Sequence, residues 1–193
     1  MAKSLKRKVG AELAPDVLAV VRQWATRCLE ICGNQPRVEL SVLVKALQGA
    51  SLIHHSNHWQ SSGPTYYGDH LLFDRIYNDT DDLIDPLAEK AVGTGSTKTV
   101  NPVLHSQQAA EFVTALHPGT DNLSDTDMAL VSYNTALAII FLIDWALKSL
   151  ESRGQLTNGI DNMLQGIADK HEEFVYLLQQ RLTVSSVSTG WKI

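Results

Sequence analysis

The sequence predicts an all-α protein: a four-helix bundle with a short helix in its long central connection and an extra helix near its N-terminal end. Apolar residues recur at helical spacing in five stretches, at about 15–33, 38–57, 66–92, 125–150 and 160–182. No stretch shows the alternation and turn residues of a β-hairpin. The chain of 193 residues, 44% of them hydrophobic, is long enough to bury one compact core.

The ends of these stretches carry recognisable signals. Pro15 suits the first turn of the first helix, and Gly93 closes the third helix before a loop rich in Gly, Ser and Thr. A short helix is expected from Ala109 to Leu116, within the connection that follows. Ser124 or Asp125 is placed to cap the start of the next long helix.

The elements divide the chain into three regions. Residues 1–36 form a basic arm and the extra helix, residues 37–184 form the bundle, and residues 185–193 form a C-terminal tail that we expect to be loosely held. The long connection between the second and third bundle helices allows a crossover topology of the ferritin-like kind.

The charge of the chain limits its partners. A formal net charge of -5 argues against a protein whose whole surface binds nucleic acid. The exception is a basic arm at the N-terminal end, formed by Lys3, Lys6, Arg7 and Lys8. This arm either contacts DNA phosphates, if many copies gather on one particle, or is a solvated terminus.

The predicted setting of the protein is the cytoplasm. The opening residues contain no apolar run of signal-peptide length, and Asp144 interrupts the most apolar stretch, so no membrane span is expected. The two cysteines, Cys28 and Cys32, do not make a disulfide framework. Lying four residues apart on a helix, they are either a redox or metal pair or small buried apolar residues.

The third stretch carries a line of side chains that can bind metal. At about 100° per residue, with His70 at zero, Asp74 lies near 40°, Asp85 near 60° and Glu89 near 100°. The apolar residues of the same stretch lie between roughly 200° and 300°. The helix therefore has a core stripe and a separate, narrow line of imidazole and carboxylate groups.

The spacing along this helix separates the four residues into two pairs. Asp74 and Asp85 are eleven residues apart, which is about 16 Å of helix. Bonds from a metal ion to its ligands are about 2 Å long, so one ion cannot bind both pairs of one straight helix. A two-fold axis that sets two copies of the helix antiparallel would place the first pair of each copy opposite the second pair of the other, which gives two equivalent sites. The mixed ligands suit iron or another borderline divalent ion better than calcium.

A solvated helix face is the other interpretation of the same residues. Asp79, Asp81 and Asp82 are further carboxylates on this stretch that need no ligand role. Pro86 supports this interpretation, because Asp85 and Pro86 together are a good N-cap and first-turn pair for a new helical segment after a kink. Spacing alone leaves both interpretations open.

The motif HWQSSGPTYYGDHLLFDRIYNDTDDLIDPLAEKA resembles the signature of the Dps family, the ferritin-like miniferritins that include DNA-binding proteins from starved cells. In that signature a His-Trp pair ends the first bundle helix and Gly and an aromatic residue follow in the turn. The second helix then supplies His, Asp four residues later, and an Asp and Glu four apart. The matching residues, without a gap, are His58, Trp59, Gly63, Tyr66 or Tyr67, His70, Asp74, Asp85 and Glu89.

The resemblance implies a homododecameric shell with ferroxidase centres shared between subunits at two-fold axes. Three ligands would come from one subunit and two from the neighbouring one: His58, His70 and Asp74, then Asp85 and Glu89. Trp59 would pack beside the centre. Fe(II) would be oxidised by hydrogen peroxide or oxygen and stored as ferric mineral, and zinc is a substitute in the same site.

Several further residues carry weaker expectations. Asp81 lies near the implied two-fold axis, where two symmetry-related copies would repel each other unless a cation or proton lies between them. Asp144 either lines an iron-entry pore at a three-fold axis or is a hydrogen-bonded acid on a buried helix. His54 and His55, one helical turn before the site, have either an extra binding role or, as the preferred interpretation, ordinary helix-end polarity, and His171 fits a surface or packing histidine.

The sequence thus predicts an iron-storage and detoxification miniferritin that is a ferroxidase. The alternative is a Dps-like shell with weak or no ferroxidase activity, which binds and compacts DNA or has a structural role. A classical ferritin is disfavoured, because such proteins build their centre inside one bundle with Glu-x-x-His pairs and this sequence has none.

Overall fold

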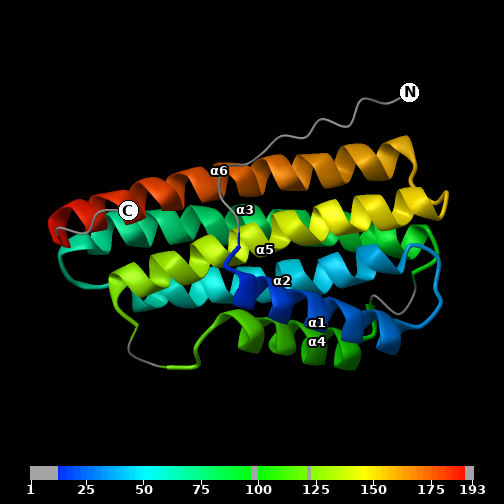
Figure 1. Ribbon diagram of the computed structural model, residues 1–193, viewed down its shortest axis with the longest axis horizontal. Helices are drawn as coiled ribbons and strands as arrows, with labels where there is room; N and C mark the ends of the chain where they lie inside the picture. Colours follow the sequence, from blue (N-terminus) through cyan, green and yellow to red (C-terminus); the bar gives the residue numbers. More distant parts are fainter. Residues whose placement is uncertain (1–12, 97–99, 121–122, 190–193) are drawn as a thin grey trace.

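Figure 1 shows a computed structural model of the chain, which describes residues 13–96, 100–120 and 123–189, with side chains as far as residue 183. The predicted all-α class is confirmed, because the described residues form helices and no strand. The helices are α1 (Pro15–Cys32), α2 (Val38–Gln60), α3 (Tyr66–Gly93), α4 (Pro102–Leu116), α5 (Asp125–Ser152) and α6 (Asn158–Thr189), with a 3₁₀ turn η1 (Gly63–Thr65).

The four longest helices form the bundle. Helix α2 packs against α3, and α5 packs against α6, while α2 also contacts α5. The connection from α3 to α5 crosses the length of the bundle and contains α4 (Figure 1). Helices α1 and α4 lie side by side against α2, on the side away from α6 (Figure 1). This is the crossover arrangement of a ferritin-like bundle with one added helix.

Two helices are longer than the sequence patterns indicated. Helix α4 begins at Pro102 instead of near Ala109, because the Asn101 side chain accepts hydrogen bonds from the backbone N–H groups of Val103 and Leu104, at 3.2 and 3.1 Å. Proline in the first turn completes this start signal. Helix α6 continues to Thr189, beyond the expected end of the bundle at residue 184. Both boundaries were predicted wrongly, because the polar residues at the start of α4 and at the end of α6 show no apolar helical pattern.

The extra helix α1 is fastened to α4 across the surface of α2. Trp24 is buried, its indole N–H donates to the backbone carbonyl of Gln108 at 2.9 Å, and its ring lies 4.8 Å from the ring of Phe112, edge to face. Helices α2 and α4 approach so closely at Gly49 that an added Cβ would lie 2.7 Å from the Phe112 ring. Helix α2 is consequently enclosed, and every residue from Val38 to Leu47 is buried.

Ion pairs join α3 to α6 on the other side of the bundle. The carboxylate of Asp69, which is buried, accepts two hydrogen bonds from the guanidinium of Arg181, at 2.5 and 2.8 Å. Lys170 lies 3.3 Å from Asp79 and 3.2 Å from Glu173. These contacts show that Asp69 and Asp79 have structural partners.

Helix α5 is long and apolar enough to cross a membrane by length and composition. Half of its most apolar window is nevertheless buried within the bundle. Ser124 caps its start by accepting the N–H of Asp127 at 3.1 Å, which confirms Ser124 as one of the two predicted caps. The apolar composition of α5 is therefore explained by its packing against α2 and α6.

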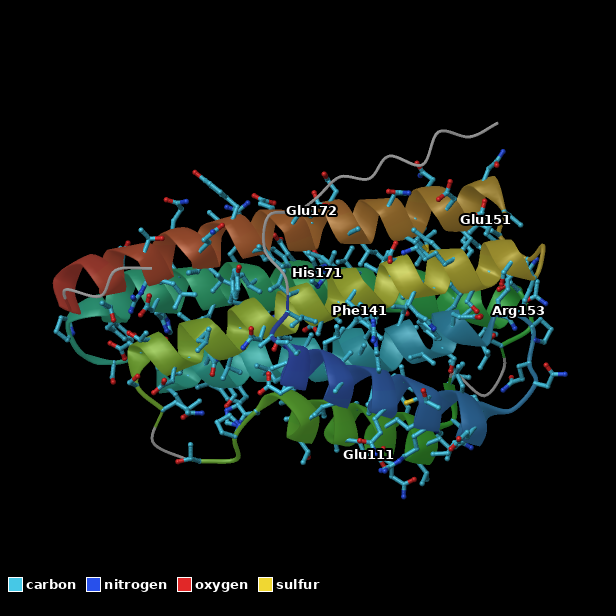
Figure 2. The ribbon with its side chains drawn as sticks, viewed as in Figure 1. Glu111, Phe141, Glu151, Arg153, His171 and Glu172 are labelled. Atoms are coloured by element: carbon cyan, nitrogen blue, oxygen red, sulfur yellow. The ribbon has the colours of Figure 1, made fainter. Side chains whose placement is uncertain are left out.

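A buried polar seam crosses the bundle between α2, α5 and α6. His54 Nδ1 lies 3.0 Å from Ser132 Oγ, which also accepts a hydrogen bond from Asn57 at 2.9 Å. His171, near the middle of α6 (Figure 2), donates from Nδ1 to the carbonyl of Ile167 at 2.9 Å. The interpretation of His54 as helix-end polarity is wrong, because α5 covers this part of α2. His171 is a packing histidine, as expected.

The two buried imidazoles predict an acid-sensitive fold. Burial lowers the pKa of His54 from 6.5 to about 3 and that of His171 from 6.5 to about 4. The unfolded chain therefore binds more protons than the folded chain between these values. The contribution of each neutral histidine to the free energy of unfolding is fully present above the pKa of the unfolded chain. It is lost as the pH falls below that value, by up to about 1.4 kcal/mol per pH unit for each histidine.

We therefore expect the midpoint of thermal unfolding to fall when the pH is lowered from about 7 to about 5. A His171→Gln variant, whose side chain does not titrate, should show a smaller fall than the unmodified protein. His117→Gln, which changes a partly exposed histidine after α4, is the control. Equal pH slopes in all three proteins would contradict the assignment.

Candidate metal centre

The predicted ligand residues lie along the exposed side of the α2–α3 pair. His58 stands in the last turn of α2, and His70 stands near the start of α3. Their rings stack with centroids 3.8 Å apart and planes at 22°. The turn QSSGPT, which contains η1, folds α3 back along α2 and so brings the two histidines together.

Reciprocal hydrogen bonds orient these two histidines. His58 Nδ1 lies 2.9 Å from the backbone carbonyl oxygen of His70, and His70 Nδ1 lies 3.1 Å from the carbonyl oxygen of His58. A carbonyl oxygen only accepts, so each Nδ1 carries the proton. In the neutral rings both Nε2 atoms therefore keep the lone pair that binds a metal ion.

A third histidine and two aromatic residues extend the site along α2. The ring of His55 stacks on Tyr77 with centroids 4.0 Å apart and planes at 13°, and it lies 4.0 Å from the ring of Trp59. His55 is thus part of the aromatic cluster, a position that helix-end polarity did not predict. The signal was present: His55 precedes His58 by three residues, which places both on one helix face.

The carboxylates of α3 fall into two groups. Within the described part of the chain, the side chains of Asp74, Asp85 and Glu89 have no hydrogen bond or ion pair to another residue. Asp81, in contrast, accepts a hydrogen bond from Ser51 on α2 at 2.6 Å. The three predicted ligands therefore have no structural partner among the described residues, as is also true of the exposed Asp82, whereas Asp81 helps to hold α3 against α2.

Helix α3 passes through Pro86 without interruption. The interpretation that Asp85 caps a new helical segment is therefore wrong. Thr80 before Pro86 and Leu87 after it are fully buried on the core side, while Pro86 is exposed, so packing holds the helix on both sides of the missing hydrogen bond. Asp85 and Glu89 consequently remain one helical turn apart on the exposed side.

One copy of the chain contains two separate parts of the predicted site. His58 and His70 lie together, and Asp74 follows His70 by one turn. The continuous helix puts Asp85 about 16 Å farther along than Asp74. Among the residues that the structure describes, no three His, Cys, Asp or Glu side chains converge as a metal-binding group.

Asp144 lies far from these residues along the chain, in an exposed position on α5. It forms an ion pair with Lys148 and lines a cleft of about 580 Å³ between α1 and α5. Arg22 from α1 lies over the ring of Phe141, labelled in Figure 2, at 5.3 Å from its centroid. The role of Asp144 in a pore stays a prediction.

The basic arm that predicted DNA contacts lies outside the described residues: Lys3, Lys6, Arg7 and Lys8. Binding of DNA therefore stays a prediction from the sequence alone.

The fold and the exposed imidazole–carboxylate line define the class of this protein: a ferritin-like helical bundle with a candidate metal centre on the outside of one helix pair. Solved Dps structures have the same fold. Dps from Thermosynechococcus elongatus matches with a TM-score of 0.61 and 17% identity, over 86% of this chain and 94% of that one. DpsC from Streptomyces coelicolor matches with a TM-score of 0.62 and 22% identity, over 76% and 85%.

A point mutant of Dps1 from Mycobacterium smegmatis matches with a TM-score of 0.54 and 13% identity, over 85% of this chain and 97% of that one. No protein-family model matches the sequence, and no curated protein matches it. The fold implied by the sequence resemblance, that of Dps proteins, is thereby confirmed.

Because α3 continues through Pro86, we expect Pro86 to lower the stability of the protein without being required for the geometry of the site. Pro86→Ala restores a backbone N–H inside α3, and proline is about 3 kcal/mol less favourable than alanine in a helix interior. We expect the free energy of unfolding to rise by about 1–3 kcal/mol, measured by denaturant titration at matched protein concentration. Asp82→Ala, also exposed on α3, should change it by less than about 0.5 kcal/mol. A Pro86→Ala protein with less helix and lower stability would contradict this.

Proposed function

We propose that the chain is the subunit of a Dps-like miniferritin, which oxidises Fe(II) at centres shared between two copies and stores ferric mineral in a homododecameric shell. The observation that carries the proposal is the reciprocal hydrogen bonding of His58 and His70. It leaves both Nε2 atoms free, one helical turn from the unpaired carboxylate of Asp74.

A second copy would supply what one chain lacks. Large apolar side chains remain exposed around the two histidines: Leu52, Trp59, Tyr66, Tyr67 and Leu71. Trp59 is 66% exposed and Tyr67 is 75% exposed, and such a patch is typical of a protein–protein contact. A two-fold contact over this patch would cover the apolar side chains and bring Asp85 and Glu89 of the second copy to the histidines.

The ligand set suits iron that changes its oxidation state. Fe(II) is a borderline ion that accepts imidazole nitrogen, and Fe(III) is harder and prefers carboxylate oxygen. With two imidazoles and three carboxylates, the centre favours the product ion. Two Fe(II) ions each lose one electron, and these electrons with two protons reduce one hydrogen peroxide to two water molecules. Zinc accepts the same ligands and would compete for the centre.

The first test measures iron oxidation directly. Purified shells are mixed with Fe(II) and hydrogen peroxide, and ferric absorbance is followed. We expect the His70→Ala/Asp74→Ala variant to lose more than about tenfold in rate, because loss of outer-shell partners of metal ligands alone costs about 10- to 100-fold. The control is Asp169→Ala/Glu172→Ala, which removes two carboxylates from α6. Equal rates in all three proteins would refute the centre.

Mixed shells test the sharing of the centre between copies. A His70→Ala/Asp74→Ala chain and an Asp85→Ala/Glu89→Ala chain should each be inactive alone. When the two are refolded together, pairs that join one chain of each kind keep one intact centre, so part of the activity should return. Co-purification through an affinity tag on one kind of chain must confirm the mixed shells, and particle mass in solution must confirm that shells form. No recovery in such shells would exclude the two-fold arrangement, and a stable monomer would exclude the shared centre itself.

A further inference from the structure

The middle of α2 contains a lysine that is completely buried. Lys45 has 0% of its surface exposed, and its ammonium nitrogen lies 2.9 Å from Ser41 Oγ and 3.1 Å from Cys32 Sγ. Within the described part of the chain, no carboxylate lies within ion-pair distance of this nitrogen. The thiol of Cys32, itself fully buried at the end of α1, is therefore the ionisable group that contacts Lys45.

This contact explains how a lysine is tolerated there. A buried ammonium is strongly unfavourable unless an opposite charge or hydrogen bonds compensate it. Lys45 donates hydrogen bonds to Ser41 Oγ and Cys32 Sγ, and a thiolate at Cys32 would also supply an opposite charge. The pair also joins two different elements, because α1 supplies the sulfur atom and α2 supplies the nitrogen.

We propose that Cys32 and Lys45 form a reversible oxidative cross-link, a sulfenamide with a covalent bond between Sγ and Nζ, which fastens the extra helix α1 to α2. The proposal rests on the contact of these two atoms and does not depend on the ferroxidase function.

Hydrogen peroxide is the oxidant in this reaction. The thiolate of Cys32 attacks one peroxide oxygen and the O–O bond breaks, which gives the sulfenic acid S–OH and hydroxide. The hydroxide takes a proton from the ammonium of Lys45 and becomes water. The free amine then attacks the sulfur atom, the S–O bond breaks, and a second water leaves with one amine proton. In total, thiolate, ammonium and one hydrogen peroxide give one S–N bond and two water molecules.

The surroundings select Cys32 over Cys28. Burial raises the pKa of Cys28 to about 12, so Cys28 stays a weakly nucleophilic thiol at neutral pH. Cys32 is instead the last residue of α1 and is followed by the exposed residues Gly33 and Asn34. Local opening of this last helical turn would give a small oxidant access to the sulfur atom, which is buried when the turn is closed.

Peptide mapping of the full-length protein tests the cross-link. The protein is treated with hydrogen peroxide, remaining thiols are alkylated, and the chain is cut with trypsin. Cleavage after Arg27 and Arg37 leaves both cysteines in one peptide and Lys45 in the next. We expect these two peptides to be joined, with the mass of two hydrogen atoms missing, and to separate when a thiol reductant is added before digestion.

The alternatives give different maps. A disulfide between Cys28 and Cys32 also lacks two hydrogen atoms but leaves the two peptides separate, as does overoxidation of Cys32 to sulfinic acid. Either result, or an unmodified Cys32, would overturn the proposal. Cys28→Ala should keep the joined peptides, whereas Cys32→Ala and Lys45→Arg should lose them. Where these variants do not fold, the map of the unmodified protein decides alone.

The cross-link should also change the behaviour of α1. In the oxidised protein, backbone amides of α1 should exchange hydrogen more slowly than in the reduced protein, because the end of the helix is held covalently. The Cys28→Ala protein should show the same slowing. Joined peptides without any slowing in α1 would refute the proposed fastening of this helix.

Discussion

The enclosure of helix α2 is the constraint on which most of this structure depends. Helices α1, α3, α4 and α5 all contact it, so polar groups along its length must find partners inside the protein. Glu39 accepts hydrogen bonds from Ser149 of α5 and from Arg153, which directly follows α5, and His54 bonds to Ser132 of α5. The neighbours of α2 are thereby fixed by specific polar contacts as well as by apolar packing.

The same enclosure decides where a metal centre can form. Helix α2 is buried without a break from Val38 to Leu47, and exposed side chains such as Leu52 and Trp59 occur only after Leu47, in the part of the helix that contains His58. At this point the backbone carbonyls of His58 and His70 each accept the imidazole N–H of the other residue. The turn between α2 and α3 therefore positions two metal-binding nitrogen atoms by backbone geometry, which depends little on the mobility of long side chains.

The sequence predicted the fold class and the line of candidate ligands on α3 because both depend on periodicity within single helices, whereas the choice of metal binding over a solvated face came from the resemblance to the Dps signature. The register of His70, Asp74, Asp85 and Glu89 needs only the rotation per residue, and it holds in the structure because α3 is continuous. The buried roles of Lys45 and His54 could not be read in this way. They depend on which helices cover α2, and that follows from long-range packing which helical periodicity does not encode. The start of α4 was missed for another reason, since the Asn101 cap was assigned to the preceding loop.

The unpaired carboxylates connect the proposed assembly to metal binding. Asp69 and Asp79 on α3 have cationic partners on α6, but Asp74, Asp85 and Glu89 have none among the described residues. A two-fold contact would collect both copies of these three residues at one interface, where like charges close together repel each other. Cations between them would replace this repulsion with attraction. In the proposed arrangement, metal ions that bind the paired subunits therefore stabilise the contact by mass action, so the shell and its centre depend on each other.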